Sequence, residues 1–398
     1  MRLALLALAT CLASSHAAAQ ASQRAVKLAQ DAVIVDTHID APSQLVKTWA
    51  DLGVSAPDRE FDYPRARAGG LEVAFMSIYT SGGQDAAGTA KQAAHAQIDA
   101  IEALLHRRPD KFAKLTSPRD VTRLRRGNRV LLALGMENGA PIVDDIKNVQ
   151  VFFDRGVRYI TLTHGTNNRI SDSSYAIERQ WDGLSPFGEQ VVAEMNRLGM
   201  MVDVSHLSDA AVLDVLRVSR APVIASHSGL RHFTPGFERN LSDELVRAIA
   251  AKGGVVQLVF GNAFIDPESA ADTQAYFVAE AKFNAENNRR RAAGEPLLSA
   301  DEFDADWDRA HPRRATDISQ VLDQVDHAVR LVGINHVGIG SDFDGVSGNL
   351  PPQLKDADDY PNLVAGLQSR GYRNADIRKI LGTNVLRVWT AVEAAARR

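Results

Sequence analysis

The stretch VIVDTHID, residues 33–40, decides the predicted fold because it joins an apolar run to two polar side chains. Its apolar and β-branched residues are typical of a parallel strand that is buried on both faces. His38 and Asp40 are two positions apart, so their side chains lie on the same face of the strand. A charge or an imidazole that is buried without a partner costs several kcal/mol. The stretch therefore predicts a strand that carries half of a metal site at its carboxyl end.

Seven further apolar runs have the length of a strand, and each is followed by a polar loop and a helical pattern. Near-continuous Val, Ile and Leu runs are typical of parallel strands that are covered by helices. The helical patterns include 185–199, 208–219 and 242–254, whose ends are marked by Ser-Asp or Gly. The eight predicted strands span 33–38, 73–79, 130–137, 157–164, 200–206, 222–228, 255–260 and 337–343.

Consecutive strand–helix units without a long linker predict one domain, a single (β/α)8 TIM barrel over residues 20–398. A doubly wound parallel sheet is the alternative. Two segments, 165–184 and 261–320, are longer than plain connections, and both follow the carboxyl end of a strand. Barrels build their active sites at that end, so we expect one or both segments to cover the site. For 261–320, a helical insertion after the seventh strand, a role in packing or in dimer contact is an equal alternative.

Residues 1–19 are predicted to be a cleaved signal peptide. Arg2 precedes an apolar run, and three alanines at 17–19 form an A-x-A cleavage pattern. The run is too short to span a membrane, so we expect an exported, periplasmic or secreted protein without a membrane anchor. The single cysteine, Cys11, lies in this leader. A lipoprotein anchored through Cys11 is the less favoured alternative, because Thr10 fits a lipidation motif poorly.

Composition and charge are those of an ordinary globular protein. Hydrophobic residues make up 45% of the chain and charged residues 24%, with a net charge of −4. The one dense basic run, residues 287–294, is interpreted as a solvated helix end. No binding to nucleic acid is therefore expected.

Six of the eight predicted strands end in a histidine, a glutamate or an aspartate. Each such residue taken alone is most simply explained as a hydrogen-bonded structural group or a helix cap. In a barrel, however, these strand ends converge on one mouth, where clustered carboxylates repel one another and need cations. The set therefore predicts a metal centre, and its members are His38 with Asp40, Glu137, His164, His206, His227 and Asp342.

The predicted ligands are nitrogen and oxygen donors without sulfur, a set that suits Zn²⁺ best, with Mn²⁺, Co²⁺ or Fe²⁺ as alternatives. Five donors exceed one tetrahedral site and fit two metals bridged by a carboxylate and a water, which becomes a hydroxide nucleophile near neutral pH. Asp342 and His164 remain for acid–base work and for polarising the scissile carbonyl. Asp36 shares the ligand face and is expected to orient a ligand. The five ligands are His38, Asp40, Glu137, His206 and His227.

Seven motifs in the chain, from about residue 30 to about residue 390, resemble those of the membrane dipeptidase (renal dipeptidase) family of binuclear zinc peptidases. They are DTHID, GMENG, LTHGTNN, DVSHLS, ASHSG, RNLSDE and GIGSDFDG, in family order. The resemblance implies that His38 and Asp40 bind one zinc ion, that Glu137 bridges both ions, and that His206 and His227 bind the other.

The same resemblance implies the residues that handle the substrate. His164 would contact the substrate carbonyl, and Arg239 in RNLSDE would hold the terminal carboxylate of a dipeptide. Asp342 would carry a proton from the attacking water to the leaving amine. Without the resemblance, Arg239 would be interpreted as a partner in a surface salt bridge.

Mammalian members of that family have a carboxyl-terminal lipid signal and disulfides, whereas this chain ends in VEAAARR and has no cysteine after its leader. It is therefore similar to soluble bacterial members, and a homodimer is a further expectation from the family. We expect a zinc-dependent dipeptidase. The alternatives are another binuclear barrel hydrolase, acting on cyclic amides, lactones or phosphoesters, and a non-catalytic periplasmic protein that binds peptides or metals.

Overall fold

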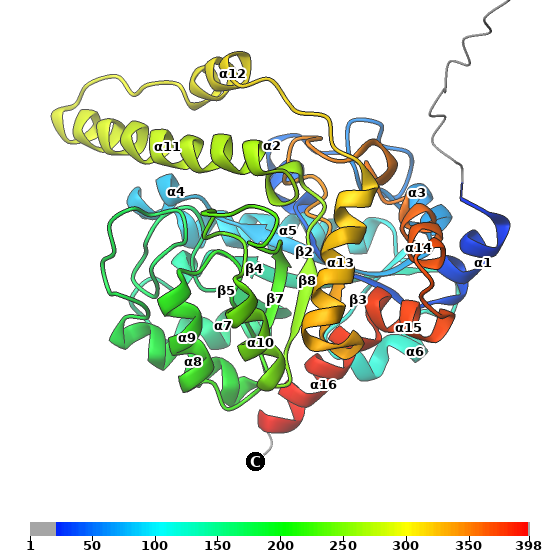
Figure 1. The fold of residues 1–398 in the computed structure, drawn as a ribbon. Helices are drawn as coiled ribbons and strands as arrows, with labels where there is room; N and C mark the ends of the chain where they lie inside the picture. Colours follow the sequence, from blue (N-terminus) through cyan, green and yellow to red (C-terminus); the bar gives the residue numbers. More distant parts are fainter. Residues whose placement is uncertain (1–20, 397–398) are drawn as a thin grey trace, which may run out of the picture.

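A computed structural model describes residues 21–396 of the chain. Eight parallel strands follow one another in the order β1-β2-β4-β5-β6-β7-β8-β9, and β3 adds to β4 outside this path. The predicted (β/α)8 barrel is thereby confirmed (Figure 1). The strands are β1 (Ile34–Ile39), β2 (Leu71–Tyr79), β3 (Phe112–Lys114), β4 (Val130–Glu137), β5 (Val157–Thr161), β6 (Met201–Asp203), β7 (Ile224–Ser228), β8 (Val255–Leu258) and β9 (Val337–Ile339).

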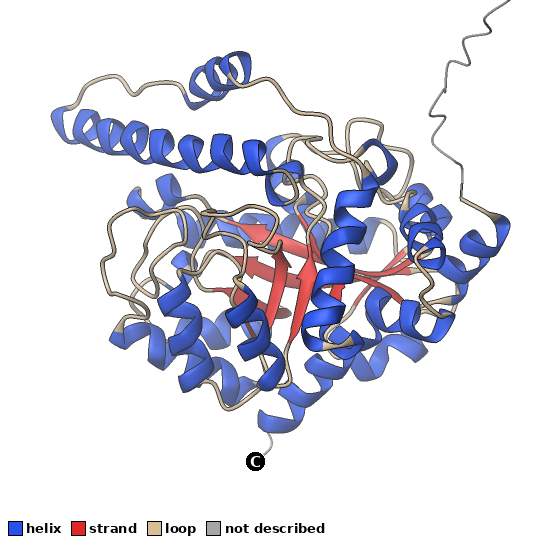
Figure 2. Ribbon diagram, viewed as in Figure 1, coloured by secondary structure: helices blue, strands red, loops and turns tan. Residues whose placement is uncertain are grey.

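Helices surround the strands, as Figure 2 shows. Serine side chains at 185, 208 and 242 cap the first turns of α8, α9 and α10, and the caps at 208 and 242 are those that the sequence predicts. The surrounding helices are α1 (Gln23–Asp31), α2 (Ala41–Lys47), α3 (Tyr63–Gly69), α4 (Gly82–Ala86), α5 (Ala90–Arg107), α6 (Val121–Leu124), α7 (Lys147–Asp154), α8 (Pro186–Leu198), α9 (Asp209–Val218), α10 (Asp243–Ala251), α13 (Ile318–Val332), α14 (Tyr360–Ser369), α15 (Asn374–Arg378) and α16 (Asn384–Ala396).

The barrel interior is a packed core and not a pore. Alternate strand residues such as Val73, Phe75 and Leu131 point inward and are fully buried. The α16 helix closes the amino-terminal end of the barrel, where the Trp389 ring lies 5.2 Å from the ring of Phe75. With this end filled, the carboxyl ends of the strands are the place where a site can open.

Four strands end earlier than the sequence pattern predicts, namely β5, β6, β8 and β9. β5, β6 and β9 stop at Thr161, Asp203 and Ile339, so the polar residues that follow them lie in loops. Two of these residues, His206 and Asp342, have a φ of 68°. That left-handed conformation is incompatible with a strand and is uncommon for residues other than glycine. The loops therefore turn the side chains across the barrel mouth at some conformational cost.

The first and last strands meet at a seam that a buried carboxylate closes. Oδ1 of Asp36 accepts hydrogen bonds from the backbone amides of His38 and Ser341, both at 3.0 Å, and its other oxygen accepts from the Tyr360 hydroxyl. Beyond this point the amide of Asp40 donates to the carbonyl of Phe343 at 2.8 Å. Asp36 thus joins the two ends of the barrel and holds the backbone at His38, one of the predicted ligands.

The segment 261–320 forms an arm of two helices, α11 (Pro267–Ala293) and α12 (Ala300–Ala310), after the short turn η3 (Asn262–Phe264). Figure 1 shows α11 running across the top of the barrel with α12 packed on it. The arm is largely exposed: only Ser269 and Ala270 of α11 are buried, and no residue of α12 is. Its two helices pack through an aromatic cluster of Tyr276, Phe283, Phe303 and Trp307.

Residues 1–20 and 397–398 lie outside the described part of the chain, so the predicted signal peptide and Cys11 do too. Among residues 21–396, no helix combines the length and the apolar character that crossing a membrane requires. The homodimer stays a prediction.

Candidate metal centre

The carboxyl ends of the strands bring the predicted ligands together at the barrel mouth. His38 is near the end of β1, Glu137 is the last residue of β4, and His227 lies in β7. Asp40 directly follows β1, and His206 lies in the loop after β6. All five residues are buried, with exposed fractions between 0% and 5%. Residues up to 189 positions apart in the sequence therefore form one polar cluster inside the protein.

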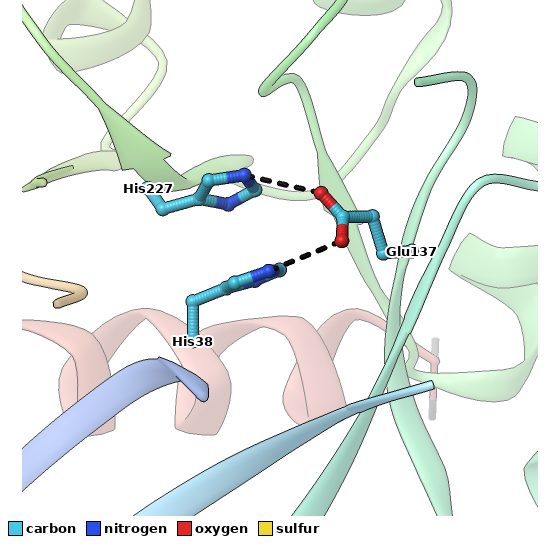
Figure 3. A group of neighbouring side chains, drawn as sticks. All are labelled: His38, Glu137 and His227. Atoms are coloured by element: carbon cyan, nitrogen blue, oxygen red, sulfur yellow. Dashed lines mark hydrogen bonds and ion pairs between the residues drawn. The ribbon is translucent and has the colours of Figure 1, made fainter. Parts of the chain in front are cut away.

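Glu137 contacts three histidines of this cluster, and Figure 3 shows its two oxygens facing His227 and His38. Its Oε1 is 3.0 Å from Nε2 of His206 and 3.2 Å from Nε2 of His227, and its Oε2 is 3.3 Å from Nε2 of His38. Burial raises the pKa of Glu137, but the imidazoles of His38 and His164 lower it by more, so it lies well below its usual range. The two oxygens of this carboxylate face two different sets of imidazoles.

The tautomer of His227 follows from the groups behind it. The Ser226 hydroxyl donates to Oδ2 of Asp203 at 2.5 Å, so its oxygen accepts from Nδ1 of His227 at 2.8 Å. Burial and the charge of His38 hold the pKa of His227 well below its usual range, which makes the ring neutral. With the proton on Nδ1, the lone pair of Nε2 points at the Glu137 carboxylate. Two electron-rich atoms facing each other at 3.2 Å leave a place for a cation.

His38 is fixed in the same way by Tyr159. The Tyr159 hydroxyl donates to the carbonyl of Thr37 at 2.9 Å and accepts from Nδ1 of His38 at 2.9 Å, so Nε2 faces the carboxylates. Burial lowers the pKa of His38, but Tyr159 and Glu137 raise it by more, to well above its usual range. The local field therefore favours a cation, a proton or a metal ion, between His38, Glu137 and Asp40.

The donor chemistry fits divalent metal ions. Three groups of side chains each place their ligand atoms within 4.8 Å of one another, and together they contain every predicted ligand. Nδ1 of His206 is buried without a hydrogen-bond partner, whereas its Nε2 points into the cluster. The groups are His38, Glu137 and His227; Glu137, His164 and His206; and His38, Asp40 and Asp342.

Asp342 stands beside Asp40 at the edge of the cluster. Burial and the neighbouring Asp40 carboxylate raise the pKa of Asp342 well above its usual range. Gly345 leaves room for both side chains: a Cβ there would lie 2.3 Å from Oδ2 of Asp40 and 2.4 Å from Oδ1 of Asp342. The glycine at the end of the motif GIGSDFDG therefore allows two carboxylates to approach each other at this point.

His164 is placed on the outer side of the cluster. Its Nε2 is 3.8 Å from Oε1 of Glu137, and its side chain is 15% exposed, more than those of the five ligands. Its ring contacts Tyr79 at 4.8 Å and Phe277 of α11 at 5.8 Å. Burial lowers the pKa of His164, which favours the neutral ring.

Arg239 is not part of a surface salt bridge, because it is only 1% exposed. Its guanidinium donates to Oγ of Ser228 at 3.0 Å and to the carbonyl of His227 at 2.7 Å, and Nε has no partner. Within residues 21–396, no carboxylate lies within ion-pair distance of it. A buried cation without a counter-ion, next to a metal centre, is a ready site for the carboxylate of a ligand.

Sequence reasoning missed the residues that orient the ligands: Tyr159, Asp203 and Ser226. For Asp203 a signal was present, because it interrupts the apolar run MMVDVSH three residues before His206, as Asp36 precedes His38 in VDTH. A carboxylate inside a buried strand needs several donors, and Asp203 accepts from Thr161, Ser205 and Ser226. Tyr159 and Ser226 carry no comparable signal.

A parallel barrel with buried histidines and carboxylates at the carboxyl ends of its strands defines a metal-dependent hydrolase. The model of the membrane dipeptidase family, peptidase family M19, matches residues 22–398, and the chain belongs to this family. It is therefore a metallo-dipeptidase, and the resemblance seen in the sequence is confirmed.

Solved structures support the same fold. The probable dipeptidase PvdM from Pseudomonas aeruginosa is 27% identical, with a TM-score of 0.79 over 94% of this chain and 98% of that one. A metallopeptidase from Rhodobacter sphaeroides, solved with a phosphinate mimic of the dipeptide L-Ala-D-Ala, is 23% identical, with a TM-score of 0.73. That match covers 91% of this chain and 99% of the other.

Proposed function

We propose that this metallo-dipeptidase uses two Zn²⁺ ions, with Glu137 as the bridge between them. The observation that carries the proposal is the position of Glu137, whose oxygens face His38 on one side and His206 with His227 on the other. Asp40 completes the first set of ligands. When bound, two such ions lower the pKa of a shared water toward neutrality and make it a nucleophile.

The other residues of the site are proposed to position the dipeptide. Arg239 binds the terminal carboxylate, since its guanidinium is buried and has no counter-ion among the described residues. His164, which is neutral and on the open side of the cluster, donates a hydrogen bond to the scissile carbonyl oxygen and stabilises the developing negative charge. The free amino group of the substrate meets the carboxylates at the edge of the cluster, which limits substrates to dipeptides.

Asp342 is proposed to move the proton. It takes a proton from the attacking water as the oxygen bonds to the carbonyl carbon, and it delivers that proton to the nitrogen as the C–N bond breaks. The products are two free amino acids, so one water is consumed for each bond cleaved. The position of Asp342 beside Asp40 supports this role.

The proposal is tested by metal content and by substrate form. Purified protein should contain two zinc ions per chain, and a strong chelator should abolish hydrolysis until zinc is restored. An unblocked dipeptide should be cleaved, whereas the same dipeptide with an amidated carboxyl terminus should be rejected because Arg239 then lacks its partner. Activity that survives chelation would overturn the metal mechanism. Preferred cleavage of cyclic amides, lactones or phosphoesters, or tight binding without turnover, would overturn the dipeptidase proposal.

A further inference from the structure

Tyr175 reaches the metal centre, although no step of the proposed reaction uses it. It lies in the loop between β5 and α8 and is only 3% exposed. Its ring centroid is 5.9 Å from that of His206, and the amide of the preceding residue, Ser174, donates to the carbonyl of His206 at 2.8 Å. The loop and the ligand are therefore fixed to each other.

The ring of Tyr175 is held on its other side by the arm. Phe277 of α11 stacks on it, with ring centroids 3.8 Å apart and planes inclined by 25°. Nε2 of Gln274, one turn earlier on α11, donates to the carbonyl of Tyr175 at 3.1 Å. Phe237 contacts the ring edge-on at 5.8 Å. Stacked aromatic rings of this kind have well-defined positions, so the hydroxyl of Tyr175 is directed to one place.

That place is beside Arg239. The Arg239 guanidinium lies over the ring of Phe264, 5.0 Å from its centroid, and Phe264 belongs to the same buried cluster as Tyr175 and Phe237. Burial raises the pKa of Tyr175, and the neighbouring charge of Arg239 opposes this rise. A guanidinium can only donate hydrogen bonds, so Arg239 does not accept the phenol proton, which stays available for donation. No backbone or carboxylate acceptor in the described part of the chain takes that proton. The free donor and the buried cation next to it form a pair suited to one anionic ligand.

We propose that Tyr175 is a second binding residue for the terminal carboxylate of the substrate, next to Arg239, and that Phe277 holds its ring in position. This inference rests on the proposed function, since it assigns the carboxylate to the same pocket. The stack of Tyr175 and Phe277 also forms a wall behind the carboxylate. A longer peptide would have to pass through that wall, so the arm contributes to the restriction to dipeptides.

The test is Tyr175→Phe, which keeps the ring and its stack and removes only the hydroxyl. We expect KM for an unblocked dipeptide such as Ala-Ala to rise by about tenfold, the usual effect of losing a hydrogen bond to a charged group, with kcat changed less than about threefold. The ratio of kcat/KM for the dipeptide to that for its carboxyl-terminal amide should fall by a similar factor. Metal content and Tm should not change.

Tyr276→Phe is the matched control, because it removes a hydroxyl from α11 that donates to Asp304, away from the site. It should leave KM and the amide ratio unchanged. If the wild type discriminates against the amide and Tyr175→Phe discriminates equally well, the role of Tyr175 is overturned and the proposed function stands. If the wild type itself cleaves the amide as readily as the dipeptide, the carboxylate pocket is overturned, and Tyr175 loses its role with it.

Discussion

The barrel mouth and the arm formed by α11 and α12 are built by different physical means. At the mouth, each candidate ligand is buried, and two of the histidines, His38 and His227, are fixed by a hydrogen bond to Nδ1. The arm is mostly exposed, and its helices pack on each other through four aromatic rings. We therefore expect the buried mouth to provide the chemistry and the exposed arm to shape the space above it. Substitutions at the mouth should change metal binding and turnover, whereas those on the arm should change substrate binding or local stability.

The largest effect is expected for Glu137→Gln, which keeps the shape of the side chain and removes its charge. The metal content should fall below two ions per chain, and kcat/KM should drop by at least roughly a thousandfold, because both halves of the site lose their shared ligand. Metal analysis measures the number of bound ions, and steady-state kinetics measures kcat/KM. Glu72→Gln is the control: Glu72 is also buried in a strand but pairs with Arg67 and Arg125. Full metal content with activity within tenfold of the wild type would remove Glu137 from the centre.

Asp342→Asn separates proton transfer from metal binding at the same mouth. Both ions should remain, and kcat should fall by roughly 10²–10⁴, the usual contribution of a general acid–base group. The measurement is kcat alongside metal content in the same preparation. An unchanged kcat would contradict the proton-transfer role. Loss of metal in this variant would instead make Asp342 a ligand together with His38 and Asp40.

Ser226→Ala tests the hydrogen bond behind a ligand. Nδ1 of His227 loses the acceptor that fixes its tautomer, so zinc affinity should fall about 10- to 100-fold. With saturating zinc, kcat should approach the wild-type value, because the ligand itself is still present. Competition with a chelator of known affinity measures the change. Ser174→Ala is the control, because Ser174 is a buried serine whose hydroxyl has no hydrogen-bond partner. Equal zinc affinities in the two variants would show that Ser226 does not orient His227.

The smallest effect is expected on the arm, at Glu280. Burial and the nearby Asp304 raise the pKa of Glu280 to about 7. The folded state therefore binds this proton more tightly than the unfolded state does. The resulting stabilisation is complete below the unfolded pKa of about 4.5 and is lost as the pH rises through about 7. Glu280→Gln should remove this dependence and stabilise the protein at pH 8 by about 1–2 kcal/mol, after allowance for partial exposure.

Unfolding by urea at pH 5 and at pH 8 tests this expectation. From pH 5 to pH 8, the free energy of unfolding should fall more in the wild type than in Glu280→Gln. An identical pH dependence in both proteins would show that the pKa of Glu280 is not raised in the folded state. Glu268→Gln is the control. Glu268 lies on the same helix as Glu280 and forms an exposed ion pair with Arg314, so its replacement should change stability by less than about 1 kcal/mol.

Much of the barrel could be predicted from the sequence, because its strands are buried on both faces and read as apolar runs. All eight predicted strands are present, and β3 was missed because it has only three residues, two of them partly exposed. The ends of β5, β6, β8 and β9 were placed too late. Val204, for example, continues the apolar run, and only the backbone conformation at His206 shows where the strand has ended.

The residues of the candidate site likewise divide into those that could be predicted from the sequence and those that could not. The clustering of the candidate ligands could be predicted, because strand topology alone brings the strand ends to one mouth. Tyr159 could not, because its role depends on a side chain that crosses the barrel interior to reach His38. Tyr175 and Phe277 could not either, because their contact joins a long loop to the helix α11, and no local pattern determines how these two segments meet. The roles of the site residues stay predictions until the variants are measured.

The seam at Asp36 has a consequence for the order of folding. The hydrogen bond from the amide of Ser341 to Asp36 joins residues 305 positions apart in the sequence. Contacts of such long range carry the largest loop-closure entropy and form late. His38 and Asp40 lie at this seam, where Asp36 accepts from the amides of both His38 and Ser341, so we expect these two candidate ligands to be fixed only after this closure. Metal uptake should therefore report the last step of folding, and a chain truncated before β9 should not retain the ions.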